Sequence, residues 1–198
     1  GNDKIWGGDG HDLLKGGDNN DCILGENGND TIYGGDKDIT QPDSGDTIYG
    51  GDGCDLVHGC DGDDFIYGGN HNDTLYGDNG SDCIHGDDGN DLAYGGNGND
   101  LIYGETGCDL LVGDAGNDVL RGGQDADTLT GGAGNDYFVF TNIVSGATSL
   151  SALNFGNDII TDFVKGQDII SFEGSMTSLI DSWDDLTSRM TYVGGNTV

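Results

Sequence analysis

The segment GGNGNDLIY at residues 95–103 sets a pattern that most of the chain repeats. Similar segments follow one another with a period of nine residues. The copies begin at Gly7, Gly16, Gly25, Gly34, Gly50, Gly59, Gly68, Gly77, Gly86, Gly95, Gly104, Gly113, Gly122 and Gly131. The period is broken between the fourth and fifth copies, by the seven extra residues 37–43. The chain is therefore a repeat protein, in which each unit supplies one element of a repeating architecture.

The sixth position of the repeat is Asp in every complete copy, which backbone geometry alone does not require. These residues are Asp12, Asp21, Asp30, Asp46, Asp55, Asp64, Asp73, Asp82, Asp91, Asp100, Asp109, Asp118, Asp127 and Asp136, with Asp3 in the partial copy before them. Positions one and two, and usually four, are small or turn-prone, mostly Gly, which permits positive φ and leaves the backbone carbonyls uncovered. Such a loop offers oxygen atoms as ligands.

The eighth position is apolar throughout and is the expected core. Its residues are Leu14, Ile23, Ile32, Ile48, Val57, Ile66, Leu75, Ile84, Ala93, Ile102, Leu111, Leu120, Leu129 and Phe138. If the last three residues of a copy form a strand, position eight faces one side, and positions seven and nine face the other. One inward side chain per copy is too little to bury alone. We therefore expect an all-β protein, a parallel β-roll (β-solenoid) with short strands, six-residue loops and two repeats per turn.

Stacking of the turns predicts rows of carboxylates that need a counter-charge. Successive loops on one edge would lie about 4.8 Å apart, the spacing of neighbouring strands, so their Asp side chains would repel. Calcium suits such a site, because it accepts six to eight oxygen ligands with flexible geometry and mixes carboxylates with carbonyls. One ion between successive loops gives roughly a dozen sites. That number of dications would neutralise most of the net charge of −31.

The repeats at Gly7 (GGDGHDLLK) and Gly50 (GGDGCDLVH) resemble the RTX calcium-binding nonapeptide, in which an apolar residue follows the Asp by two positions. The resemblance extends over residues 1–139. It implies a parallel β-roll, secretion from bacterial cells in an unfolded state, and calcium held by the repeat Asp side chains and by loop carbonyls. The carbonyl ligands would be those of Gly7, Gly8, Gly10, Gly50, Gly51, Gly53, Gly68, Gly69, Gly95, Gly96, Gly98, Gly131, Gly132 and Gly134.

Two segments depart from the repeat. Residues 37–43 are expected to form an insertion loop, because the register resumes after them. Residues 140–198 are expected to hold degenerate rungs and a small C-terminal cap, similar to the segment that closes the roll in serralysin-type secreted proteases. Shortened copies at 156–161 and 166–171 predict two further rungs, with Asp158, Asp162 and Asp168 as additional calcium ligands. Residues 182–190 predict one short helix, with Ser182 as its N-cap.

Composition excludes several classes of function. Six Lys and Arg against 37 Asp and Glu make nucleic acid an improbable partner, because phosphate contacts need cationic side chains. No apolar run approaches the ~20 residues of a membrane span. The five cysteines, Cys22, Cys54, Cys60, Cys83 and Cys108, occupy repeat positions too far apart for disulfides, so we expect free thiols. Both ends of the sequence fall inside a repeat or strand, which predicts a longer parent protein.

No catalytic constellation is evident in these residues. The four histidines, His11, His58, His71 and His85, are scattered over variable positions of the repeat. The metalloprotease motif HExxH and the nucleophile motif GxSxG are both missing from the sequence. Every regular Asp has a more direct explanation as a calcium ligand. We therefore expect no enzyme activity from these residues, while a catalytic domain elsewhere in the polypeptide stays open.

Positions seven and nine carry many apolar side chains, which should lie on the outside of the roll. One face is expected to present Leu13, Leu56, Leu92 and Leu110 beside Tyr33, Tyr76 and Tyr94. The other is expected to present Cys22, Phe65, Cys83, Leu101 and Val119 beside Trp6, Tyr49, Tyr67 and Tyr103. Tyr side chains at strand spacing can simply stack on one another. Exposed apolar surface of this extent is otherwise typical of a contact site.

Three functions remain open at the level of sequence. The first is a calcium-stabilised extracellular structural or secretion module, with assembly into a fibre, sheath or surface layer as one outcome. The second is the noncatalytic module of a larger secreted enzyme, toxin or adhesin, as a likeness to serralysin-type proteases or alginate epimerase modules implies. The third is a binding module in which the Tyr residues stack on the rings of a polysaccharide. The expected partners are calcium and either further copies of the chain or neighbouring domains.

Overall fold

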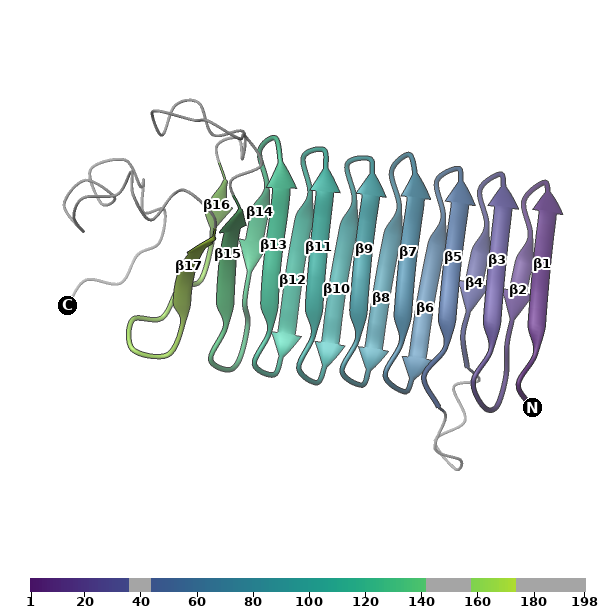
Figure 1. Ribbon diagram of the computed structural model, residues 1–198, viewed down its shortest axis with the longest axis horizontal. Helices are drawn as coiled ribbons and strands as arrows, with labels where there is room; N and C mark the ends of the chain where they lie inside the picture. The colour runs from purple at the N-terminus through teal and green to yellow at the C-terminus, as the bar shows by residue number, and fades with distance from the viewer. Residues whose placement is uncertain (36–43, 142–157, 174–198) are drawn as a thin grey trace.

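A computed structural model describes residues 1–35, 44–141 and 158–173, and these residues are all-β, without a helix (Figure 1). The strands are β1 (Lys4–Asp9), β2 (Leu13–Lys15), β3 (Cys22–Asn27), β4 (Thr31–Tyr33), β5 (Thr47–Asp52), β6 (Leu56–Asp61), β7 (Phe65–Asn70), β8 (Thr74–Asn79), β9 (Cys83–Asp88), β10 (Leu92–Asn97), β11 (Leu101–Thr106), β12 (Leu110–Ala115), β13 (Val119–Gln124), β14 (Thr128–Thr130), β15 (Tyr137–Thr141), β16 (Ile159–Ile160) and β17 (Ile169–Glu173). No helix in this part of the chain has the length and hydrophobicity needed to span a membrane.

The strands form two parallel sheets that lie face to face (Figure 1). The odd-numbered strands β1 to β17 make a nine-stranded sheet, and the even-numbered strands β2 to β16 make an eight-stranded sheet. Leu92 pairs with Leu110 and Leu101 with Val119, so that partners are 18 residues apart, the length of two repeats. The parallel β-roll with two repeats per turn is therefore confirmed.

The interruption of the repeat changes the number of residues between paired positions but not the register of the strands. Cys22 of β3 pairs with Thr47 of β5, which is 25 residues further along the chain rather than 18. The sheets therefore continue in the same register on both sides of the interruption. The insertion itself, residues 37–43, lies outside the described residues.

Most strands are longer than the sequence predicts. The prediction was a three-residue strand at positions seven to nine, but β10 runs for six residues, from Leu92 at position seven to Asn97 at position three of the next copy. Pairing skips position one and resumes at positions two and three, where Gly96 pairs with Asp114. The Gly98 N–H extends the connection by donating to the carbonyl of Ala115, at 2.8 Å. The connecting loop is thus about three residues long, because glycines of the loop also join the ladder.

The core is a single file of side chains between the sheets. Every predicted eighth-position residue from Leu14 to Phe138 is buried, and those from Ile23 onward are fully buried. Ile5 at one end, and Ile160, Phe163 and Ile170 at the other, pack against this file. Positions seven and nine lie on the outer faces, as the alternating burial along β8 and β10 illustrates. The predicted core is therefore confirmed.

Two shortened rungs continue the roll beyond the regular repeats. Ile160 of β16 pairs with Leu129 of β14, and Ile170 of β17 pairs with Phe138 of β15. Both sheets thus extend through the two degenerate copies that the sequence indicates. The predicted helix at residues 182–190 lies outside the described residues, and the division into a roll over 1–139 and a cap over 140–198 stays a prediction.

Candidate metal centre

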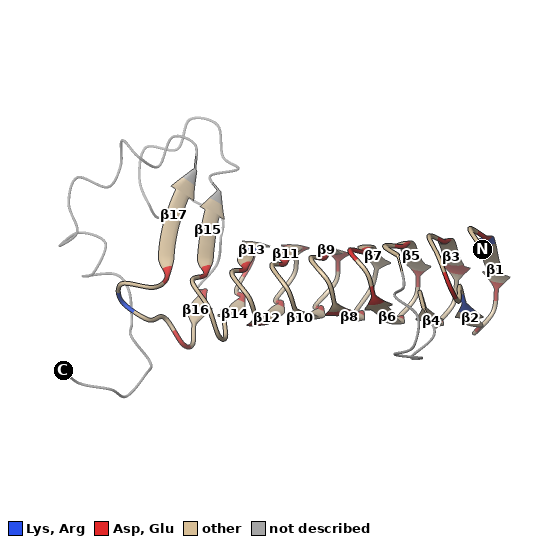
Figure 2. Cartoon of the chain, turned by 90° about the horizontal axis from the view of Figure 1, so that it is seen from below, with Lys and Arg blue, Asp and Glu red and all other residues tan. Residues whose placement is uncertain are grey.

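The sixth-position Asp residues form two rows along opposite edges of the solenoid, where the chain turns from one sheet to the other (Figure 2). The first Asp row precedes the odd strands and consists of Asp3, Asp21, Asp46, Asp64, Asp82, Asp100, Asp118, Asp136 and Asp168. The second Asp row precedes the even strands and consists of Asp12, Asp30, Asp55, Asp73, Asp91, Asp109, Asp127 and Asp158. The structure therefore places the predicted acidic residues in two groups, one along each edge of the solenoid.

Within each row the carboxylates are linked by hydrogen bonds to the backbone. The Asp82 N–H donates to Oδ1 of Asp100 at 2.9 Å, and the Asp100 N–H donates to Oδ1 of Asp118 at 2.9 Å. The same bond recurs from Asp3 to Asp168 and from Asp12 to Asp158, at 2.6 to 3.2 Å. From Asp21 in the first row and Asp30 in the second, Oδ1 of each carboxylate thus links its turn to the preceding one.

In twelve members of the two rows, the second carboxylate oxygen lacks a hydrogen-bond donor. The row members from Asp21 to Asp136 are 0 to 3% exposed, whereas Asp12 and Asp158 at the ends are half-buried. Their Oδ2 atoms are buried and without a hydrogen-bond partner in Asp12, Asp21, Asp30, Asp55, Asp73, Asp82, Asp91, Asp100, Asp109, Asp118, Asp127 and Asp158. A buried anionic oxygen without compensation is costly, because burial in a low-dielectric surrounding removes its hydration. These atoms therefore need a positive partner.

Two glycine positions make room for this arrangement. A Cβ at Gly95, in position one, would overlap Oδ2 of Asp100 and the carbonyl oxygen of Gly113. A Cβ at Gly98, in position four, would overlap the carbonyl oxygen of Gly80 in the preceding turn, and the φ of +140° also favours glycine there. The glycines therefore leave both the carboxylates and the loop carbonyls uncovered by side chains.

The local electrostatics oppose ionisation of the rows. The pKa of Asp73 is raised to about 8, mainly by burial and also by the charges of Asp55 and Asp91, although the hydrogen bond from the Asp55 N–H lowers it. Burial likewise raises the pKa of Asp82, Asp91, Asp118 and Asp127 to about 7. Near neutral pH, the fold therefore favours either a proton or a cation at these carboxylates.

The donor set fits a hard cation. Among the described residues, no three His, Cys, Asp or Glu side chains gather as a metal-binding group. A cation at the rows would combine carboxylates with the backbone carbonyls that the glycines leave uncovered, and such all-oxygen sites suit calcium rather than metals that select His and Cys ligands. Most of the predicted carbonyl ligands at positions one and two lie in the second half of the long strands, and those at position four lie in the loops that follow. Their role as ligands stays a prediction.

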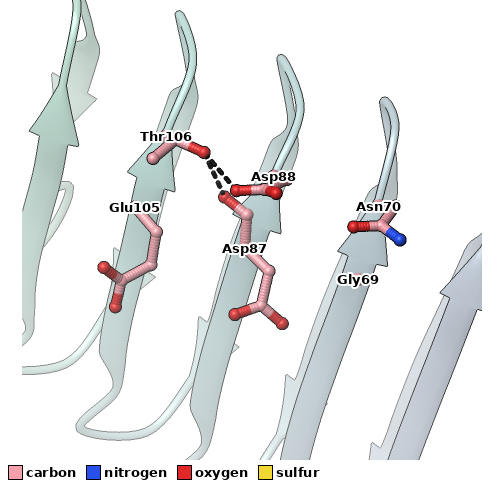
Figure 3. Close-up of a pocket in the computed structure, with 6 residues that line it drawn as sticks. All are labelled: Gly69, Asn70, Asp87, Asp88, Glu105 and Thr106. Atoms are coloured by element: carbon pink, nitrogen blue, oxygen red, sulfur yellow. Dashed lines mark hydrogen bonds between the residues drawn. The ribbon is translucent and has the colours of Figure 1, made fainter.

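A further set of acidic residues, which are not members of the rows, lines a hollow on the outer face (Figure 3). Asp87, Asp88 and Glu105 line a shallow hollow of the nine-stranded sheet, together with the Thr106 hydroxyl, which donates to Oδ1 of Asp88 at 2.6 Å. Asp87 and Glu105 occupy position two with φ of 69° and 75°, where most copies have Gly. Sequence reasoning missed this group, although the acids at a Gly position were a visible signal.

The outer faces carry two aromatic ladders, and the predicted assignment of side chains to the two faces is confirmed. Position nine of the eight-stranded sheet stacks Tyr33, His58, Tyr76 and Tyr94, and the nine-stranded sheet stacks Tyr49, Tyr67, His85 and Tyr103, with ring centroids 4.5 to 5.2 Å apart. Sequence reasoning placed two histidines in scattered positions, but the structure inserts them into the ladders. His58 also contacts Oδ2 of Asp78 at 2.9 Å.

The ladders cover most of their own ring faces. Each inner ring lies between two neighbours, while Lys15 lies over Tyr33 and Arg121 lies over Tyr103 at about the distance of a cation–π contact, 5.3 and 5.4 Å. A sugar would therefore meet ring edges and hydroxyl groups rather than the open faces that stacking needs. Polysaccharide binding stays a prediction, although the ring faces on which a sugar was expected to stack are occupied by neighbouring rings.

The cysteines are thiols, as expected. All five lie in the described ranges and none forms a disulfide. Cys83 and Cys22 are partly buried on the outer face, whereas Cys54 and Cys108 are exposed in the loops. The described part of the solenoid is therefore held by strand pairing, aromatic stacking and the hydrogen bonds of the Asp rows, without disulfides.

A comparison with protein families agrees with this geometry. The family model described as RTX calcium-binding nonapeptide repeat (4 copies) matches residues 1–32, 43–59, 49–82, 76–111 and 103–138. A search of curated proteins gave no match. The likeness of the C-terminal segment to serralysin-type proteases stays a prediction, because the matched residues end before it.

The raised pKa values predict that acid stabilises the metal-free roll. The folded chain binds protons at Asp73 and Asp82 more tightly than the unfolded chain, whose Asp residues have the ordinary pKa of 3.8. This contribution to stability is complete below pH 4 and is lost as the pH rises through 7 to 8. In chelator, the strand signal in circular dichroism should therefore grow between pH 8 and pH 5. Saturating calcium should remove most of this trend, and a metal-free signal that grows with rising pH would contradict it.

Proposed function

The chain belongs to the RTX calcium-binding nonapeptide repeat family, and from this premise we propose that it is an extracellular structural module held together by calcium. The observation that supports this function best is the file of buried Oδ2 atoms without a donor along both Asp rows. Each ion would lie between successive turns on one edge and would be shared by two copies of like parity. Roughly a dozen ions would fill the two rows.

The ligands that we propose are the members of the two Asp rows other than Asp168, whose two oxygens both accept backbone N–H groups, together with carbonyls of the glycines at positions one, two and four. Calcium would supply the positive charge that lets neighbouring carboxylates share one edge of the roll. The Asp residues keep the turns in register through the hydrogen bonds that Oδ1 accepts. The glycines keep side chains out of the space beside Oδ2. A roll over residues 1–139, followed by a closing segment over 140–198, would then be the working unit.

Calcium would also decide whether the roll folds. Each nine-residue copy buries one apolar side chain, while ordering the backbone costs about 1–2 kcal/mol per residue. The apolar core alone does not offset this cost, and stacked anions add repulsion to it. A chain of this kind would cross a membrane unfolded where calcium is scarce and would fold outside, where calcium is abundant. The proposed location is therefore extracellular or on the cell surface, and the proposed role needs no catalysis.

The shared-ion arrangement predicts that a change inside a row does more damage than the same change at its end. Asp91→Asn keeps an oxygen that can accept the Asp73 N–H but removes the charge shared with both neighbouring turns. Asp12→Asn, the matched control at the start of the same row, affects a carboxylate with one neighbouring turn. Asp91→Asn should therefore raise the calcium midpoint of folding several-fold more, measured by circular dichroism. Equal shifts for the two variants would contradict a shared array.

Lateral assembly is a second candidate function, supported by apolar side chains on the outer faces. Trp6 is 57% exposed, Leu13 66% and Phe65 52%, and the ladders give each face a regular surface. Burying such surface gains about 25 cal/mol per Å², so rolls whose charge calcium has reduced would pack side by side. A fibre, sheath or surface layer would be the result, and neighbouring domains of a longer chain are the alternative cover.

Assembly predicts that light scattering of the chain rises with protein concentration in millimolar calcium. Phe65→Lys should reduce this association, because it places a charge in the centre of the apolar surface. Asn70→Lys, on the same strand β7 but near a bend, is the control and should change it less. A monodisperse monomer at high concentration, unchanged by Phe65→Lys, would leave the assembly without support.

A further inference from the structure

The two Asp rows end differently, at the two shortened rungs. The second Asp row continues to Asp158, whose Oδ1 accepts the Asp127 N–H at 3.0 Å. Both Asp127 and Asp158 keep a buried Oδ2 without a hydrogen-bond partner, as in the regular repeats. This pair therefore reproduces the features of the regular pairs, although Asp158 lies beyond the residues that the family model matches.

The first Asp row ends at Asp168, and here the chain satisfies the carboxylate itself. Oδ1 of Asp168 accepts the Asp136 N–H at 3.2 Å, and Oδ2 accepts the Val164 N–H at 2.6 Å. The second bond comes from within the same loop and has no equivalent in a regular copy such as that of Asp100. Asp168 is thus buried with both oxygens hydrogen-bonded.

Side chains of the last rung also hydrogen-bond to the backbone of the preceding loop, at residues 131–134. Asp162 stands where a regular copy has the first glycine, and its two oxygens accept the N–H groups of Gly131 and Gly132 at 2.9 and 2.7 Å. Nε2 of Gln167 donates to the carbonyl of Gly134 at 3.3 Å. That carbonyl occupies position four, where the regular loops leave the oxygen uncovered. An amide donor thus takes the place that the repeats leave to a cation.

We propose that the cation array ends asymmetrically, with a calcium site at Asp127 and Asp158 on one edge and a metal-free closure by Asp162, Gln167 and Asp168 on the other. The closure gives the last regular loop hydrogen-bond partners from within the chain. The array therefore ends one rung earlier on the first Asp row, and Asp162 and Asp168 are structural acids rather than ligands. This inference rests on the proposed binding of calcium by the regular rows.

The test is the number of calcium ions bound per folded chain, measured on the whole 198-residue chain by equilibrium dialysis and by native mass spectrometry. Asp158→Asn, which keeps the shape and an acceptor for the Asp127 N–H, should lose one ion relative to the unchanged chain. Gln167→Ala is the matched variant on the other edge and should keep the full number. Circular dichroism at saturating calcium checks that both variants are folded, and native mass spectrometry counts ions on folded molecules alone.

The outcomes separate the closure from the proposed function. Loss of an ion in Gln167→Ala, or a full number in Asp158→Asn, would overturn the asymmetric ending while the unchanged chain still binds its array. If the unchanged chain binds no calcium, the proposed function itself fails. Asp168→Asn gives a further measure, because it should lower the thermal stability of the roll without lowering the number of ions.

Discussion

Burial of like charges is the constraint on which the rest of the structure depends. The Asp rows place carboxylates at intervals of one turn, with 0 to 3% exposure for the regular members from Asp21 onward. Ordinary stabilising terms do not resolve this, because the apolar core is one side chain wide and the chain has only six Lys and Arg against 37 acidic residues. Calcium, which repeats of this family bind, would supply the missing positive charge.

In each repeat, the two carboxylate oxygens of the Asp have different roles. Oδ1 of Asp100 fixes the register by accepting the Asp82 N–H, and Oδ2 faces the space kept open by Gly95. Position eight fills the interior, and position nine covers the outside with stacked rings. Each contact reaches only the next turn, so stability is a sum of neighbouring terms, and the same geometry can be extended by any number of copies. An array of this kind also needs an ending, which the residues around Asp162 supply.

The repeat made most of this fold predictable. The period fixed the number of copies per turn, the apolar eighth position identified the core, and the uniform Asp identified the candidate ligands. Strand length was not predictable, because it depends on pairing at Gly96 and Asn97, whose residue types favour loops. The insertion of His58 and His85 into the ladders was missed because stacking is set by register across turns. The hydrogen-bonded state of Asp168 also could not be inferred, since it depends on a loop one residue longer than the regular one.

The central claim is that calcium compensates the buried carboxylates and thereby folds the roll. The most direct measurement is far-UV circular dichroism of the chain at pH 7.5, first in chelator and then during titration with calcium, with magnesium as the control ion. The account predicts a largely unfolded spectrum in chelator, a cooperative gain of strand signal in millimolar calcium and little effect of magnesium. A strand signal in chelator equal to that in calcium would contradict it.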